Sequence, residues 1–202
     1  MPSISDQDFN PAFVEQAQAG DESAQQAIYL HFAPQVYKLA RHILQCEASA
    51  EEVVQECFVD VLCKIEHFRH QGSFAGWLRR IAVNHCLMLL RSSWIKKRHH
   101  VEEFDGLEGD DQGPIDHMAV RGLNHIFSKL PAQTRAVLWL HDVEGYTHGE
   151  IAKFMGKSIS FSKSQLVRAH EKIRDQWQNQ SLSENQATGD EVSSCMPLLN
   201  NY

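Results

Sequence analysis

Apolar residues recur every three or four positions over most of this chain, which predicts α-helices. In the first half, the spacing predicts a short helix over 10–20 and a second helix capped by Asp21. A further helix is expected to begin at Pro34, because proline inside a helix kinks or breaks it. Ser49 is the expected N-cap of the next helix, with Glu52 as its capping-box partner.

The helix that follows Ser49 has two different faces. Val53, Cys57, Val61 and Ile65 form an apolar row at four-residue spacing. The opposite face carries Glu52, Gln55, Glu56 and Asp60. This acidic face suits a protein partner, but solvated acids near a helix N-terminus are an alternative interpretation, because the helix dipole favours them there.

Residues 67–74 are expected to form a loop that contains two phenylalanines and a glycine, with Ser73 as the cap of the next helix. Arg69 and further arginines surround these rings. Aromatic rings beside arginines are the composition that stacks unpaired bases and neutralises phosphates. The alternative is that Phe74 and Trp77 are ordinary core residues.

Residues 102–116 are acidic, contain three glycines and a proline, and show no hydrophobic period, which predicts a flexible linker. A second helical unit follows. Thr147 and Glu150 form a capping box, and Gly156 ends that helix. A longer helix is expected to begin near 160–162, which completes a helix-turn-helix pattern. A generic helical hairpin would give the same periodicity.

Charge is distributed unevenly along the 202 residues, whose net charge is −7. Residues 64–100 carry eight Lys/Arg and one acid, whereas residues 102–116 carry seven acids and no base. Such segregation indicates separate partners for separate segments. No apolar run nears the ~20 residues that a bilayer requires, and we expect no secretory signal, because the first ten residues have neither a basic flank nor an apolar core. Five cysteines without a C-x-x-C pair indicate a reduced, cytoplasmic protein.

Several motifs together resemble the sigma-70 family of bacterial RNA polymerase sigma factors, in its extracytoplasmic-function (ECF) group. The first two are SAEEVVQECF at 49–58 and FRHQGSFAGWLRRIAVN at 68–84. The others, in family order, are LP at 130–131, EGYT at 144–147, EIA at 150–152 and KSQLVRA at 163–169. The entry to the last helix, Ser160-Phe161-Ser162, departs from the family's usual Gly-Thr-Val.

The resemblance implies roles for these residues. The polymerase-binding set would be Glu51, Glu52, Gln55, Glu56 and Asp60. The minus-ten DNA set would be Phe68, Arg69, Ser73, Phe74, Trp77, Arg79, Arg80, Asn84, Arg91, Lys96 and Lys97. The minus-thirty-five set would be Lys163, Ser164, Gln165, Val167 and Arg168. The loop would take a flipped base, and the acidic linker would thread toward the polymerase active centre.

The expected fold is all-α, with two small helical domains joined by a flexible acidic linker. The expected boundaries are 10–98 for polymerase binding and minus-ten recognition, 99–116 for the linker, 117–178 for the helix-turn-helix domain, and 179–202 for a disordered tail. Expected partners are core RNA polymerase, promoter DNA as duplex and opened strand, and an anti-sigma factor or other regulator. We expect no cofactor, no metal and no membrane contact by the chain itself.

Two other function classes are weighed against this hypothesis. A one-component helix-turn-helix regulator would bind a specific duplex tightly without polymerase, and it would need neither the acidic face nor the aromatic loop. An enzyme would need a recognisable site, but the sequence has no nucleophile elbow, P-loop or zinc-ligand spacing. The chain is therefore expected to direct transcription initiation by binding rather than by catalysis.

Overall fold

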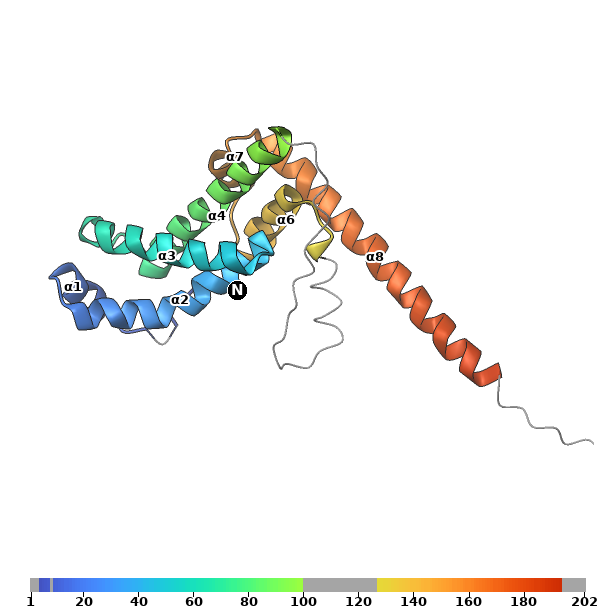
Figure 1. The fold of residues 1–202 in the computed structure, drawn as a ribbon, viewed down its shortest axis with the longest axis horizontal. Helices are drawn as coiled ribbons and strands as arrows, with labels where there is room; N and C mark the ends of the chain where they lie inside the picture. Colours follow the sequence, from blue (N-terminus) through green and yellow to red (C-terminus); the bar gives the residue numbers. More distant parts are fainter. Residues whose placement is uncertain (1–3, 8, 100–126, 194–202) are drawn as a thin grey trace, which may run out of the picture.

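Helices make up most of the chain that the computed structural model describes, which is residues 4–7, 9–99 and 127–193 (Figure 1). No strand occurs in these ranges, and the all-α prediction is confirmed. Among the described helices, none has the length and apolarity needed to cross a bilayer.

The first unit consists of four α-helices and one short 3₁₀ turn. These are α1 (Ala12–Gln18), α2 (Glu22–Leu44), α3 (Glu47–Lys64), η1 (Ile65–His67) and α4 (Phe74–His99). Asp21 caps α2 as predicted, because its Oδ1 accepts hydrogen bonds from the backbone N–H groups of Ser23 and Ala24 at 2.8 and 3.2 Å.

Two helix starts in this unit differ from the prediction. Pro34 lies inside a continuous α2 instead of beginning a new helix. An internal proline costs about 3 kcal/mol, but Phe32 and Val36 on either side of it are fully buried, and each contributes ~1.5–3 kcal/mol. The start of α3 was also predicted wrongly, since the helix begins at Glu47 and follows Cys46, not Ser49.

The second unit contains α6 (Ala132–Leu138), the π-helical turn η2 (Trp139–Val143), α7 (His148–Met155) and α8 (Ile159–Ser193). The predicted capping box is present. Thr147 Oγ1 accepts from Glu150 N at 3.3 Å, and Thr147 N donates to Glu150 Oε2 at 3.0 Å. Gly156 ends α7 with φ +62°, as the glycine predicted.

Helix α8 is longer than the sequence indicated. It extends away from the other helices to Ser193, through part of the stretch expected to be a disordered tail (Figure 1). Once the first turns are packed against the protein, each added residue gains one backbone hydrogen bond, so a polar sequence can continue the helix. Residues 194–202 lie outside the described residues.

The two units pack against each other through α2, α4, α6 and α7. Their buried apolar side chains form one continuous cluster that includes Ile28 and Ile43 of α2 and Leu140 and Ile151 of the second unit. The His42 and Trp139 rings also stack across the junction at 4.0 Å between centroids. The predicted linker lies outside the described residues apart from His99, so the domain boundaries stay a prediction.

Arg135 of α6 reaches from the second unit into the first. Its Nε donates to the Ile43 carbonyl at 3.1 Å, Nη2 donates to Leu44 O at 3.4 Å, and Nη1 donates to Leu130 O at 3.0 Å. Ile43 and Leu44 form the last turn of α2, where helix carbonyls lack partners of their own. Arg135 therefore caps a helix that is distant from it in the sequence.

The buried cysteines are expected to resist alkylation in the folded protein. Cys57 and Cys86 are fully buried, and burial raises the pKa of the Cys57 thiol to about 12. Burial also raises the pKa of Cys86, so neither thiol supplies thiolate at pH 8. Cys63 is exposed and should react. Iodoacetamide labelling with peptide mass mapping tests this, with urea-unfolded protein as the control. Equal native labelling of Cys57 and Cys63 would contradict it.

Candidate functional site

The acidic face of α3 is open to solvent. Glu51, Glu52, Gln55 and Glu56 are all exposed, whereas the apolar row behind them is buried. Val59 lies one turn after Gln55 and is 58% exposed, so the face combines carboxylates with an exposed apolar side chain. Such a mixed surface suits a protein partner.

Asp60, the fifth residue of the predicted acidic set, differs from the other four. Its carboxylate is 2.8 Å from Lys64 Nζ and 3.0 Å from His85 Nε2. The hydrogen bond from Lys64, followed by that from His85, holds the pKa of Asp60 below its usual range. Because His85 belongs to α4, Asp60 joins the acidic face to the helix that carries the basic residues.

The two loop phenylalanines are buried, contrary to the expectation that they offer open ring faces. Phe68 and Phe74 are 8% and 5% exposed. Their centroids lie 5.4 Å apart, and the half-buried Trp77 lies 5.4 and 5.5 Å from them. The core alternative for Phe74 is therefore correct in this conformation, because burying both rings removes a large apolar area from water.

Five other members of the predicted minus-ten set are exposed in the loop or along α4. They are Arg69, Ser73, Arg80, Asn84 and Arg91. Ser73 precedes α4 as predicted, and its Oγ accepts from Gly76 N at 3.0 Å. The side chains of Lys96 and Lys97 lie outside the described part of the chain. The exposed set gives α4 and the preceding loop a polar, mainly cationic surface.

Arg79 faces the second unit instead of solvent. Its Nη1 lies 3.6 Å from Glu144 Oε2, and its guanidinium lies over the Tyr146 ring at 5.4 Å. The Glu144 side chain is fully buried and also accepts from Trp139 Nε1 at 3.0 Å. In this arrangement Arg79 is held within the protein, so the phosphate-binding role expected for it is not available.

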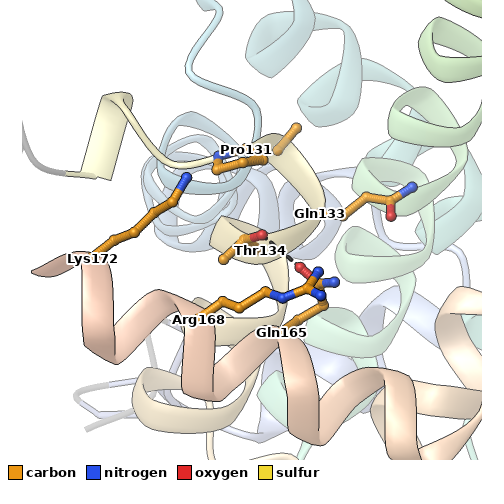
Figure 2. Close-up of a pocket in the computed structure, with 7 residues that line it drawn as sticks. Pro131, Gln133, Thr134, Gln165, Arg168 and Lys172 are labelled. Atoms are coloured by element: carbon orange, nitrogen blue, oxygen red, sulfur yellow. Dashed lines mark hydrogen bonds between the residues drawn. The ribbon is translucent and has the colours of Figure 1, made fainter.

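On α8, four of the five predicted base-reading residues point outward and one points inward. Lys163, Ser164, Val167 and Arg168 are exposed. Gln165 is only 8% exposed, and its Oε1 accepts from the buried Thr134 hydroxyl at 2.6 Å (Figure 2). Gln165 is thus placed to satisfy Thr134 rather than to face DNA, because a buried hydroxyl requires a partner.

A cavity of about 380 Å³ lies between the start of α6 and α8. Figure 2 shows Arg168 and Lys172 of α8 on one side of it and Pro131, Gln133 and Thr134 on the other. Two cationic side chains therefore line this cavity. Within the residues that the structure describes, no group of three His, Cys, Asp or Glu side chains could hold a metal ion.

The sequence did not predict two contacts between residues that are distant in the chain, Glu144 with Arg79 and Thr134 with Gln165. It also did not predict that the exposed Val59 interrupts the acidic face. A local motif gives no signal for the first two contacts, since they join different helices. The exposed position of Val59 could have been found from its four-residue spacing to Gln55.

Two family profiles match the chain. The profile described as Sigma-70 region 2 matches residues 28–95, and the profile described as Sigma-70, region 4 matches residues 122–173. The first match covers α3 and nearly all of α4, and the second covers α6, α7 and the start of α8.

Curated relatives agree with these profiles. The ECF RNA polymerase sigma factor SigE of Mycolicibacterium smegmatis is 30% identical over 164 residues, which are 77% of this chain and 63% of that protein. The chain thus spans less than two thirds of that relative. The ECF RNA polymerase sigma-E factor of Escherichia coli K12 is 26% identical over 184 residues, 84% of this chain and 95% of that protein.

Two solved structures share the fold. The sigma factor RpoE of Bartonella quintana, in complex with the anti-sigma factor NepR, has a TM-score of 0.58 at 18% identity, covering 76% of this chain and 96% of RpoE. CnrH, in complex with the cytosolic domain of CnrY, has a TM-score of 0.51 at 20% identity, covering 83% of this chain and 96% of CnrH.

Proposed function

Because the chain belongs to the sigma-70 family of RNA polymerase sigma factors, in its ECF group, we propose that it binds core RNA polymerase and directs promoter recognition, DNA melting and transcription initiation. The observation that carries the proposal is the pairing of two surfaces on packed neighbouring helices. An exposed acidic face on α3 adjoins an exposed cationic surface on α4 and its preceding loop, with Asp60 and His85 in contact between them.

The acidic face of α3 is the proposed polymerase contact. Exposed carboxylates steer association with a basic partner, and the exposed Val59 adds apolar area that binding would bury. Four side chains of this face need no rearrangement to reach a partner, since all are already exposed: Glu51, Glu52, Gln55 and Glu56. Asp60 is expected to support this surface through its pairing with α4.

The loop between α3 and α4, together with exposed α4 residues, is the proposed site for the opened minus-ten strand. Flipping a base out of a duplex costs a few kcal/mol, and stacking on an aromatic ring returns ~1–3 kcal/mol. Since Phe68 and Phe74 are buried, the half-buried Trp77 and the polar rim of Arg69, Ser73 and Asn84 are the groups best placed to hold a base. Capture of the flipped base therefore favours promoter sequences whose base pairs open easily.

Arg79 would take part in DNA binding only after a change in conformation. Its contact with the buried Glu144 belongs to the junction between the two units. The Arg79 side chain is only 20% exposed and its guanidinium lies over the Tyr146 ring, so little of it is open to a phosphate while the junction is closed. We therefore infer that promoter binding separates Glu144 from Arg79, and that polymerase stabilises the separated form.

The outward face of α8 is the proposed contact with the minus-thirty-five duplex. Lys163, Ser164, Val167 and Arg168 are exposed near the start of this helix, which is the part that a helix-turn-helix presents to base edges. Gln165 is left out of the proposed reading set because it is buried against Thr134.

The proposed role is binding and needs neither catalysis nor a cofactor from this chain. It requires core polymerase and promoter DNA, which are found in the bacterial cytoplasm. In the two solved structures described above, RpoE is in complex with the anti-sigma factor NepR, and CnrH is in complex with the cytosolic domain of CnrY. We propose that this chain likewise has an anti-sigma partner.

Reconstitution tests the proposed function directly. The purified chain is combined with core RNA polymerase on a genomic template, and the 5′ ends of the transcripts are sequenced. Starts that require the chain and share two upstream elements are expected. Core polymerase without the chain is the control. Absence of such starts, or tight binding to a specific duplex without polymerase, would instead favour a one-component regulator.

Asn84→Ala is expected to slow promoter opening about tenfold, while closed-complex formation changes little. Asn84 is exposed on α4, and its amide can hydrogen-bond an unpaired base, which is worth roughly 1–1.5 kcal/mol. Permanganate reactivity of bubble thymines measures opening, and a gel shift with heparin omitted measures closed complexes. Ser92→Ala, at another exposed polar position on α4, is the control. Bubble reactivity equal to that of the parent would contradict the role.

A further inference from the structure

We propose that Gln18 of α1 is a positioning residue for the base-capturing loop, so that a helix outside the DNA surface sets which base the loop accepts. The proposal rests on the proposed function, because it assumes that the loop between α3 and α4 takes an unpaired base. Helix α1 lies before residue 28, where the match to Sigma-70 region 2 begins.

Gln18 uses its whole amide to hold this loop. Its Nε2 donates to the Ile65 and Phe68 carbonyls, both at 2.8 Å, and its Oε1 lies 2.9 Å from His70 Nε2. The two carbonyls require donors, which fixes the orientation of the amide and leaves Oε1 as an acceptor. His70 must therefore carry its proton on Nε2 to donate to Gln18.

The backbone at His70 explains why such a clamp is needed. His70 has φ +56°, in the left-handed region, which costs a non-glycine residue roughly 1–2 kcal/mol. Gly72, two residues later, has φ +111°, which favours glycine. A loop with two positive-φ residues has many competing conformations, and the three hydrogen bonds of Gln18 select one of them.

The other end of the loop is also held from the N-terminal segment. Asp6 Oδ1 accepts from Ala75 N at 2.9 Å, in the first turn of α4. The Phe9 ring lies 6.4 Å from Phe74 and 4.8 Å from Phe32, between centroids. Gln18 therefore holds the start of the loop, where it leaves η1, and Asp6 holds its end, where it enters α4. The tip from Arg69 to Ser73 stays exposed.

Gln18 is itself half-buried, and both hydrogens of its amide are donated to loop carbonyls, so it has no donor left to offer to DNA. Its effect on base choice would pass through the positions of the Phe68 carbonyl and the His70 side chain. The buried ring cluster beneath these residues would remain in place without Gln18. We therefore expect the tip alone to loosen when the clamp is removed.

The test measures base discrimination, which a merely structural role would not change. Promoters carrying each of the four bases at the flipped minus-ten position are opened by holoenzyme, and opening rates are compared using a 2-aminopurine reporter at the neighbouring position. For Gln18→Ala, the ratio between the best and worst base should fall about fivefold, the equivalent of one hydrogen bond. Affinity for core polymerase and the minus-thirty-five footprint should not change.

Two further variants make the result decisive. Gln16→Ala removes an exposed glutamine from the same helix and should leave the ratio unchanged. His70→Asn keeps a residue that tolerates positive φ but is too short to reach Gln18, so it should lower the ratio even if Gln18→Ala folds poorly. An unchanged ratio in both clamp variants, or an equal loss on all four bases, would overturn the proposal. If the parent holoenzyme opened none of the promoters, the proposed function would fail as well.

Discussion

The double substitution Glu52→Lys with Glu56→Lys is expected to abolish co-purification of the chain with core RNA polymerase. The two glutamates are four residues apart on α3, and both are exposed on the proposed docking face. Replacing them places two positive charges against the polymerase surface, which is proposed to favour negative charges. Like-charge contact at an interface costs several kcal/mol, so affinity should fall at least ~100-fold. Pull-down and interferometry with purified core polymerase measure the change.

The chain offers a closely matched control for this experiment. Glu171 and Asp175 are also exposed acids at i and i+4, on α8 and outside the proposed docking face. Glu171→Lys with Asp175→Lys changes the net charge by the same amount. It should leave polymerase affinity close to that of the parent. If both double variants bound equally well, the docking role of the α3 face would have to be abandoned.

Arg135→Ala is expected to lower the free energy of unfolding by about 3 kcal/mol. Arg135 is 5% exposed and donates to three carbonyls, two of them in the last turn of α2. Burial lowers its pKa to about 10, which leaves the guanidinium protonated at neutral pH. Removing it would leave buried carbonyls without donors, at roughly 1–3 kcal/mol for each that water does not reach. Urea unfolding followed by circular dichroism measures the loss.

Two variants separate the loss of the Arg135 hydrogen bonds from the loss of one positive charge. Arg174→Ala, at an exposed position on α8, should change stability by no more than ~0.5 kcal/mol. Arg135→Lys keeps the charge, but a lysine lacks the planar fork that serves three carbonyls, so its stability should be intermediate. If Arg135→Ala matched Arg174→Ala, the two units would not be packed in solution as they are in the structure.

Features that depend on neighbouring residues could be predicted from the sequence. Asp21 caps α2, and Thr147 with Glu150 caps α7, because a capping contact spans at most three residues. The acidic face of α3 follows from four-residue spacing in the same way. The family motifs also lie within short stretches, so the sequence alone is enough to identify the family.

The sequence was misleading where a distant partner outweighed a local preference. Pro34 predicted a helix start, but the buried Phe32 and Val36 hold α2 together through it. The phenylalanines of the loop had the composition of a stacking surface, but the core beneath α4 takes up both rings. In each case burial of apolar area against another helix exceeded the local preference.

The sequence by itself determined most of the helices and of their caps, the family and the exposed acidic and cationic faces, because these depend on spacing within a few turns. Only the tertiary structure decided which polar side chains are free to meet a partner. Gln165 was turned inward by Thr134, Arg79 was engaged by Glu144, and Gln18 was joined to the loop. A polar group removed from water has to find a hydrogen-bonding partner, and only the folded chain brings that partner within reach.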